Sequence, residues 1–294
     1  MAARPICCAL LLALLLAVPC RAGEPEPPKS DAVAKELFGA QTAPADLQAR
    51  AIGFYAKGCL AGATALPING ETWQVMRLSR NRNWGHPKLI GYLEKLAAEA
   101  PKVGWRGLLV GDLAQPRGGP MQTGHASHQI GLDADIWLTP MPENRLSTEE
   151  RESLQATNVV NGEWTDVDPQ VWTPQHGAII KAAAQDPDVE RIFVNAAIKK
   201  ALCREAGSVD RGWLHKVRPY YGHYYHFHVR MRCPNDSADC TGQPAVPEGE
   251  GCGSDLAWWF SEAVRKPKKP ASVPQRQMKL SALPPACRQV LMAP

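Results

Sequence analysis

Five of the eight histidines of this chain lie in two short segments, 125–135 and 222–228, and the first segment adds two aspartates. These residues are His125, His128, Asp133 and Asp135 in the first segment, and His223, His226 and His228 in the second. Imidazole and carboxylate groups are zinc ligands, and a catalytic zinc keeps three protein ligands and one open position. The two segments therefore contain the donor set of a zinc hydrolase.

The second segment runs into an alternating stretch, 226–232, which predicts a strand. Residues two apart on a strand point the same way, about 7 Å from one another. His226, His228 and Arg230 then share one face, while the residues between them are apolar. Two neighbouring imidazoles on a strand can both bind one metal ion. Alternatively, one binds the metal and the other contacts the metal-bound water. A polar, solvated strand face without metal is the alternative.

The first segment combines a turn with a second alternating stretch, 132–138. Gly131 permits a turn, so His128 can approach a carboxylate on the strand that follows. Asp133 and Asp135 share one face of that strand, and the alternation does not choose between them; either could instead pair with an arginine. His125 can be a further ligand, a partner behind the ligands, or neither.

The elements that must position these residues form an α+β pattern. Apolar positions 89, 93 and 96 predict one face of a helix, and 107–112 reads as a buried strand. Thr173 followed by proline predicts a helix start, and this helix runs to about residue 186. A short strand at 191–194 precedes a helix over 195–207. We expect a small antiparallel sheet flanked by helices and long loops.

The N-terminus reads as a secretory signal peptide over residues 1–22, with an apolar run at 6–18 and Ala22 at the cleavage position. That run is too short for a membrane span, so no stable membrane insertion is expected. Residues 23–50 read as a leader that is poor in core-forming residues. The sequence thus predicts an exported protein.

Six cysteines remain after the predicted cleavage, and they are Cys59, Cys203, Cys233, Cys240, Cys252 and Cys287. An even number in an oxidising compartment predicts three disulfides. Six cysteines allow 15 pairings. The spacing alone favours only one disulfide, the local loop from Cys233 to Cys240.

Composition limits the remaining function classes and the domain organisation. The formal net charge of +4 over 294 residues is too mild to indicate nucleic-acid binding. We expect one domain over residues 51–263. The lysine- and proline-rich stretch 265–286 predicts an extended tail within a final segment, 264–294. Nothing in the sequence indicates an oligomeric state.

The pattern His128-x6-Asp135 followed by His226-x-His228 resembles the group of lysostaphin-type, D-Ala-D-Ala and sonic hedgehog-like zinc peptidases. Within that group, the chain resembles the penicillin-insensitive murein endopeptidase family over most of residues 58–290. The motifs that carry the likeness are Gly58-Cys59 with Leu66-Pro67-Ile68, Gly124 to Gln129, Asp188 to Asn195, Lys216-Val217-Arg218-Pro219, and His228-Val229-Arg230 with Arg232-Cys233-Pro234.

The resemblance implies a ligand set and a catalytic pair. One zinc ion would be held by His128, Asp135 and His228, with His125 close enough to be counted with the metal site. His226 would be the partner of the metal-bound water, and His223 a second catalytic histidine.

The resemblance also implies the disulfide pairs Cys59–Cys287, Cys203–Cys252 and Cys233–Cys240, so that Cys287 ties the tail back to the domain. One departure concerns the segment between the two clusters. The best-known member has there an Asp and a His that can bind an additional metal, whereas this chain has Asn161-Gly162-Glu163-Trp164. We therefore expect a single zinc ion.

The function implied by the resemblance is hydrolysis of the D-alanyl–meso-diaminopimelyl cross-links of peptidoglycan in the periplasm. Three alternatives stay open: a D,D- or L,D-carboxypeptidase, a ferrous-iron oxygenase, and a non-catalytic wall-binding protein with a structural metal. The chain contains no S-x-x-K, G-x-S-x-G or H-E-x-x-H motif, which disfavours a serine mechanism and the commonest metalloprotease helix.

Overall fold

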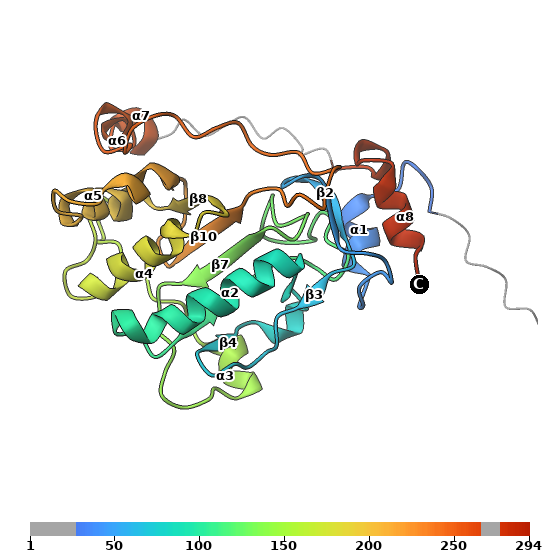
Figure 1. Cartoon of the computed structure of the whole chain (residues 1–294), viewed down its shortest axis with the longest axis horizontal. Coiled ribbons are helices and arrows are strands. Elements are labelled where there is room, and N and C mark those ends of the chain that lie inside the picture. The colour runs from blue at the N-terminus through green and yellow to red at the C-terminus, as the bar shows by residue number, and fades with distance from the viewer. Residues whose placement is uncertain (1–27, 266–276) are drawn as a thin grey trace, which may run out of the picture.

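A six-stranded mixed sheet lies at the centre of the chain in the computed structural model, which describes residues 28–265 and 277–294 (Figure 1). The predicted signal peptide lies outside these residues. In their order across the sheet, the strands are β4 (Trp73–Val75), β6 (Leu108–Val110), β7 (Asp133–Trp137), β10 (His226–Met231), β8 (Val189–Val194) and β9 (Val217–Pro219).

The four inner strands pair antiparallel, but the two outer pairs, β4 with β6 and β8 with β9, are parallel. The α+β class is thus confirmed, while the expectation of a purely antiparallel sheet is corrected. Parallel neighbours need a crossover connection, usually a helix. Helix α2 (Pro87–Glu99) lies between β4 and β6 in the chain, and helix α5 (Ala196–Glu205) lies between β8 and β9.

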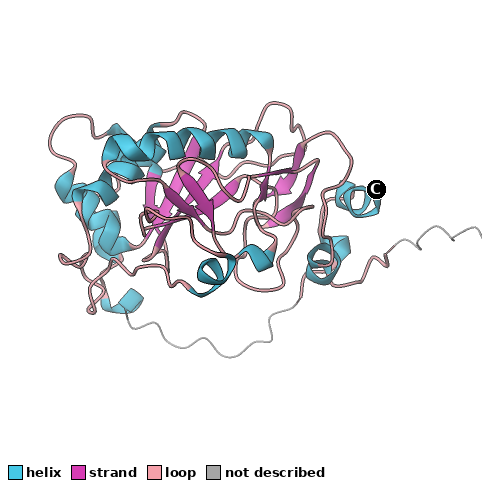
Figure 2. Ribbon diagram, turned by 90° about the horizontal axis from the view of Figure 1, so that it is seen from below, coloured by secondary structure: helices cyan, strands magenta, loops and turns pink. Residues whose placement is uncertain are grey.

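Helices α2, α4 (Pro174–Gln185) and α5 lie where the sequence predicts helices, and α4 and α5 begin at their predicted caps. In α2 the predicted apolar face is buried. Helix α4 starts with a capping box between Thr173 and His176. The Asn195 side chain accepts the N–H of Ala197 at the start of α5. Figure 2 shows the longest helix on one side of the strands, and loops with short helices on the other side.

The two ends of the described chain meet on a hairpin beside the sheet (Figure 1). The hairpin is formed by β1 (Arg50–Phe54) and β2 (Lys57–Ala61), and helices α1 (Ala34–Gly39) and α8 (Ala286–Met292) pack with it in a separate core cluster. Arg117 reinforces this contact, because its guanidinium donates to three backbone carbonyls between residues 290 and 293.

This packing changes the interpretation of the C-terminal segment. Residues 266–276 lie outside the described part, but from residue 277 the chain is not an extended tail. It forms a 3-10 turn, η4 (Leu280–Ala282), and helix α8, because Leu280, Leu283 and Val290 have apolar partners in the second core cluster. The domain boundary at residue 263 stays a prediction.

The remaining elements are short. They are β3 (Thr64–Ala65), η1 (Leu78–Arg80), β5 (Trp84–Gly85), η2 (Ala100–Val103), α3 (Thr148–Ser153), η3 (Gly212–Lys216), α6 (Ser254–Trp258) and α7 (Glu262–Arg265). The three disulfides join the cysteines as expected: Cys59–Cys287, Cys203–Cys252 and Cys233–Cys240. Within residues 28–265 and 277–294, every helix is too short or too polar to cross a membrane.

Candidate active site

The paired strands β7 and β10 carry the polar side chains at the centre of the two histidine-rich segments. Their register places His228 opposite Asp135 and Arg230 opposite Asp133. These four side chains are buried and contact one another on one face of the sheet. Phe227, between the two histidines of β10, is fully buried in the core. The alternation predicted for both strands is confirmed.

A tight turn brings His128 back over β7. His128 has a left-handed φ of 66°, and Gly131 a φ of 71°. A β-carbon at Gly131 would lie 2.5 Å from the Leu60 side chain and 2.9 Å from the backbone nitrogen of His86, so only glycine fits. The His128 N–H donates to the Asp133 carboxylate at 3.0 Å, which fixes the turn on the strand.

Asp133 is occupied by protein partners. Its Oδ1 lies 3.0 Å from Nε2 of His228 and accepts from Nε of Arg230 at 2.8 Å, and its Oδ2 accepts from Nη2 of Arg230 at 3.2 Å. Burial alone raises the pKa of Asp133, but Arg230 and His228 outweigh burial and hold this pKa well below its usual range. The carboxylate thereby orients the His228 ring from behind.

Asp135 faces four imidazoles. Its Oδ1 lies 3.0 Å from Nδ1 of His228 and 3.5 Å from Nε2 of His128. Its Oδ2 lies 3.5 Å from Nδ1 of His125 and 3.6 Å from Nε2 of His226. Burial raises the pKa of Asp135, but the surrounding histidines lower it further, so that the net pKa lies well below the usual value.

The donor atoms around Asp135 fit a metal ion. One atom each of His125, His128 and Asp135 lies within 4.8 Å of the others, so this group could hold a cation. Both ring nitrogens of His128 and Oδ1 of Asp135 are buried and have no hydrogen-bond partner among the described residues. Buried polar atoms are normally hydrogen-bonded. A cation with nitrogen and oxygen ligands would satisfy them.

His125 is held from the side that faces away from Asp135. Its Nε2 lies 3.0 Å from Oδ2 of Asp112, directly after β6, so its Nδ1 is directed at Asp135. The same Asp112 oxygen accepts from Arg80 and Arg82, each at 2.9 Å. Burial raises the pKa of Asp112, but His125 and the two arginines outweigh burial and lower this pKa to about 2.

Sequence reasoning missed Asp112 as a site residue. The only signal was a carboxylate at the end of the strand predicted over 107–112. No spacing rule connects that position with His125, because the two meet only through the fold of the long connection between β6 and β7.

His226 and His223 complete the cluster, with ring centroids 4.8 Å apart. His223 follows Gly222 in a left-handed turn with a φ of 53°. Its Nδ1 lies 2.7 Å from the carbonyl oxygen of Tyr221, which assigns the proton to Nδ1 and leaves Nε2 as an acceptor. Burial lowers the pKa of His223 to about 3 and also lowers the pKa of His226. Both rings are therefore neutral at pH 7.

Two pockets adjoin the histidine cluster, and His125 lines both. The first is formed by Arg80, Trp137 and Tyr225 together with Asp135 and His226. The second is formed by Phe54, Phe193 and Tyr220 together with His223 and His228. A chain-like ligand whose middle lies at the cluster has room to continue into either pocket. All six residues predicted for the site are thus brought together.

Comparison with known proteins gives one consistent result. Residues 51–292 match the family described as penicillin-insensitive murein endopeptidase. The chain is 48% identical to the penicillin-insensitive murein endopeptidase of Haemophilus influenzae over 85% of both chains. It is 45% identical to that of Pectobacterium atrosepticum, over 82% of this chain and 84% of the relative. The Escherichia coli protein of the same name is 43% identical, over 85% of this chain and 89% of its own.

Proposed function

Because the chain belongs to the penicillin-insensitive murein endopeptidase family, we propose that it hydrolyses the D-alanyl–meso-diaminopimelyl cross-links of peptidoglycan with one zinc ion. The convergence of His128, Asp135 and His228 carries the zinc part of this proposal, since these donors meet at one buried point. The names of the relatives support the substrate class, because murein is their stated substrate.

The proposed ligand atoms are Nε2 of His128, Oδ1 of Asp135 and Nδ1 of His228, with Nδ1 of His125 as a fourth donor near them. Asp133 holds the ring of His228 from behind. Such outer partners fix the orientation and the proton position of a ligand imidazole. Zinc in this site would lower the pKa of a bound water toward about 7 and polarise a carbonyl.

His226 supplies the proton transfers, with His223 beside it. His226 is neutral at pH 7, and its Nε2 points toward Asp135, so it can take the proton of the attacking water as general base. His226 then gives this proton to the leaving amine, and His223, whose Nε2 is free as an acceptor beside it, accepts a hydrogen bond from the reacting groups. A non-catalytic wall-binding protein would not need either base.

The two adjoining pockets favour an internal bond over a terminal one. A carboxypeptidase needs space for only one residue beyond the scissile bond, whereas a cross-link continues as a peptide on both sides. The three disulfides fit an oxidising compartment. We therefore propose a periplasmic enzyme, exported by residues 1–22.

Digestion of purified sacculi tests this function. We expect cross-linked muropeptide dimers to fall to monomers at the same rate with and without penicillin. A chelator should stop the reaction, and zinc should restore it. Monomers that lose a terminal D-alanine while dimers persist would identify a carboxypeptidase, and sacculi that bind the protein without any change would identify a wall-binding protein. Metal analysis of the purified protein separates zinc from iron.

A further inference from the structure

Exposed aromatic side chains gather beside the candidate active site. Among the described residues, four aromatic side chains are exposed, each by about half: Trp164 at 47%, Tyr220 at 52%, Tyr221 at 57% and Trp258 at 53%. Exposed apolar surface of this kind marks a binding site when its members are contiguous. Ring contacts connect Tyr220 with Tyr221 and, through Trp259, with Trp258, and Trp164 lines the same groove as the two tyrosines.

Two of these rings, together with the half-buried ring of Trp259, form a continuous row that starts at the catalytic histidines. The ring of Tyr220 lies 5.7 Å from that of His223, Tyr221 follows at 6.1 Å, and Trp259 at 5.0 Å from Tyr221. We call Tyr220, Tyr221 and Trp259 the aromatic row. Trp258 contacts the end of the row at 5.3 Å from Trp259.

The aromatic row forms one side of a groove. Trp164 and Tyr224 belong to the same groove, and their rings are 4.9 Å apart. Tyr220 also lines the pocket at His223 and His228, and Tyr224 also lines the pocket at Asp135 and His226. A substrate that occupies the active site therefore continues directly into the groove.

The low number of charged residues in the groove limits the kinds of ligand that it can bind. Among the described residues that line the groove, Glu163 is the only charged one. Anionic lipids and nucleic acids are bound by clustered Lys and Arg, and the described residues that line the groove include neither. The peptide stems of murein carry small or charged side chains, which offer nothing for aromatic faces to cover. Hexose rings of the glycan strand are uncharged, with apolar C–H faces and polar edges, and they match aromatic faces bordered by polar groups such as Asn195.

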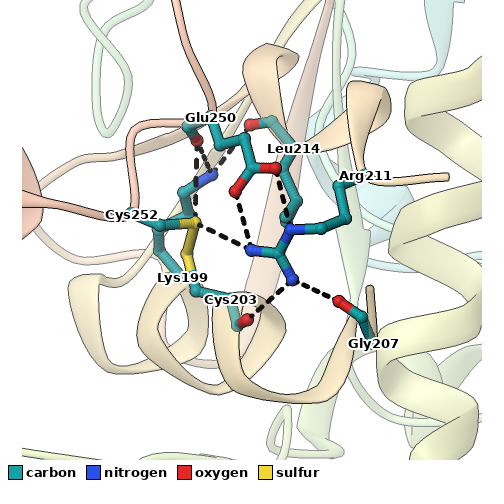
Figure 3. The surroundings of a disulfide bond; sticks show 7 residues. All are labelled: Lys199, Cys203, Gly207, Arg211, Leu214, Glu250 and Cys252. Carbon is teal, nitrogen blue, oxygen red and sulfur yellow. Dashed lines mark hydrogen bonds and ion pairs between the residues drawn. A yellow bond between two sulfur atoms is a disulfide. The ribbon is translucent and has the colours of Figure 1, made fainter. Parts of the chain in front are cut away.

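The segment that carries Trp259 is anchored firmly next to α5. The disulfide Cys203–Cys252 joins α5 to the residues just before α6 (Figure 3). The fully buried Lys199 donates to the carbonyl oxygens of Leu214 at 2.7 Å and Glu250 at 2.6 Å.

Arg211 completes this cluster from the other side. Its guanidinium donates to both carboxylate oxygens of Glu250, at 2.8 and 2.7 Å. The anchoring limits the movement of Trp259 relative to Tyr221, so a ligand need not order this part of the groove when it binds.

From these contacts we propose that the groove binds amino-sugar rings of the glycan strand, stacked on the aromatic row, while the peptide cross-link lies at the histidine cluster. This inference rests on the proposed function, because it assigns a second part of the same substrate.

Two matched substrates test the proposal. One is a cross-linked muropeptide dimer that still carries its disaccharides, and the other is the same dimer after an amidase has removed the sugars. We expect Tyr221→Ala and Trp259→Ala each to raise KM for the sugar-bearing dimer about tenfold. The KM for the sugar-free dimer should not change. Tyr221→Phe keeps the ring and should behave as wild type, as should Ile68→Ala, which alters an exposed apolar residue elsewhere.

Calorimetric titration with a tetramer of N-acetylglucosamine gives a readout that does not need turnover. Wild type should bind it, and the double variant Y221A/W259A should not. Equal losses on both dimers, or tetramer binding that survives the double variant, would overturn the inference. If wild type cleaves neither dimer, the proposed function fails, and the tetramer titration then decides the sugar site by itself.

Discussion

Asp112 and His125 form a pair in which the carboxylate holds one ring nitrogen at 3.0 Å and thereby turns the other toward Asp135. The pair links an arginine-bound carboxylate to the histidine cluster. This contact keeps Nδ1 of His125 directed at Asp135, because a side chain without such a partner in a loop would sample other rotamers. The importance of this orientation can be measured.

Replacement of Asp112 by Asn should weaken metal binding by about 10- to 100-fold, because a ligand histidine loses the partner that orients it. Competition with a chelator of known affinity measures this change. Asp166→Asn removes a partly exposed carboxylate that pairs with Arg204 rather than with a histidine of the cluster, and it should leave metal affinity unchanged. Unaltered affinity in a folded D112N protein would show that His125 does not contribute to the site.

His128→Ala and His226→Ala should separate metal binding from proton transfer. The first removes a proposed ligand, so both bound zinc and activity should disappear. The second should keep most of the zinc but lower kcat by about 100-fold or more, as expected for loss of a general base. Zinc content and turnover are measured on the same preparations. A His226→Ala protein with full turnover would exclude this histidine from the mechanism.

Lys199 predicts a pH dependence of stability. Burial lowers its pKa from 10.5 to about 7. Above pH 7 the unfolded chain therefore binds a proton that the folded protein does not, and stability rises with pH up to the unfolded pKa. Relative to Lys199→Met, wild type should gain about 2 kcal/mol between pH 7 and pH 9 in urea unfolding. Lys95→Met, at an exposed position, should show a pH-independent difference from wild type.

The disulfide Cys59–Cys287 should contribute more stability than Cys233–Cys240. The first spans 228 residues and the second 7. Loss of loop entropy in the unfolded chain predicts about 5 kcal/mol for the long loop and about 2 kcal/mol for the short one. Guanidinium unfolding of the two double-alanine variants compares them. Equal losses would indicate that residual structure in the unfolded chain, rather than loop length, sets the contribution.

The sequence predicted the centre of the site well, because the alternation along a strand determines to which side each side chain points. Alternation along β7 placed Asp133 and Asp135 on one side of their strand, alternation along β10 did the same for His226 and His228, and pairing of the two strands puts all four on one face of the sheet. Alternation could not distinguish the two aspartates. Their difference arises from Arg230, which occupies one carboxylate through a contact across strands.

The sequence was less informative wherever a contact depends on chain topology. The parallel pairing of the outer strands depends on crossovers through α2 and α5, and Asp112 reaches His125 only because β6 lies beside β7. The prediction of an extended C-terminal tail was wrong for a related reason. Its lysines and prolines indicate an extended chain, but Leu280 and Val290 find apolar partners from the opposite end of the sequence.

The second core cluster can form only after nearly the whole chain has been synthesised. Ala34 and Phe38 come from one end of the described chain, and Cys287 and Val290 from the other. A ribosome delivers these two groups about 250 residues apart, at roughly 5–20 residues per second. This core therefore cannot be completed until residue 290 has emerged, many seconds after residue 38. A chain interrupted before that point never completes this core, so exposed apolar surface distinguishes incomplete molecules from finished ones.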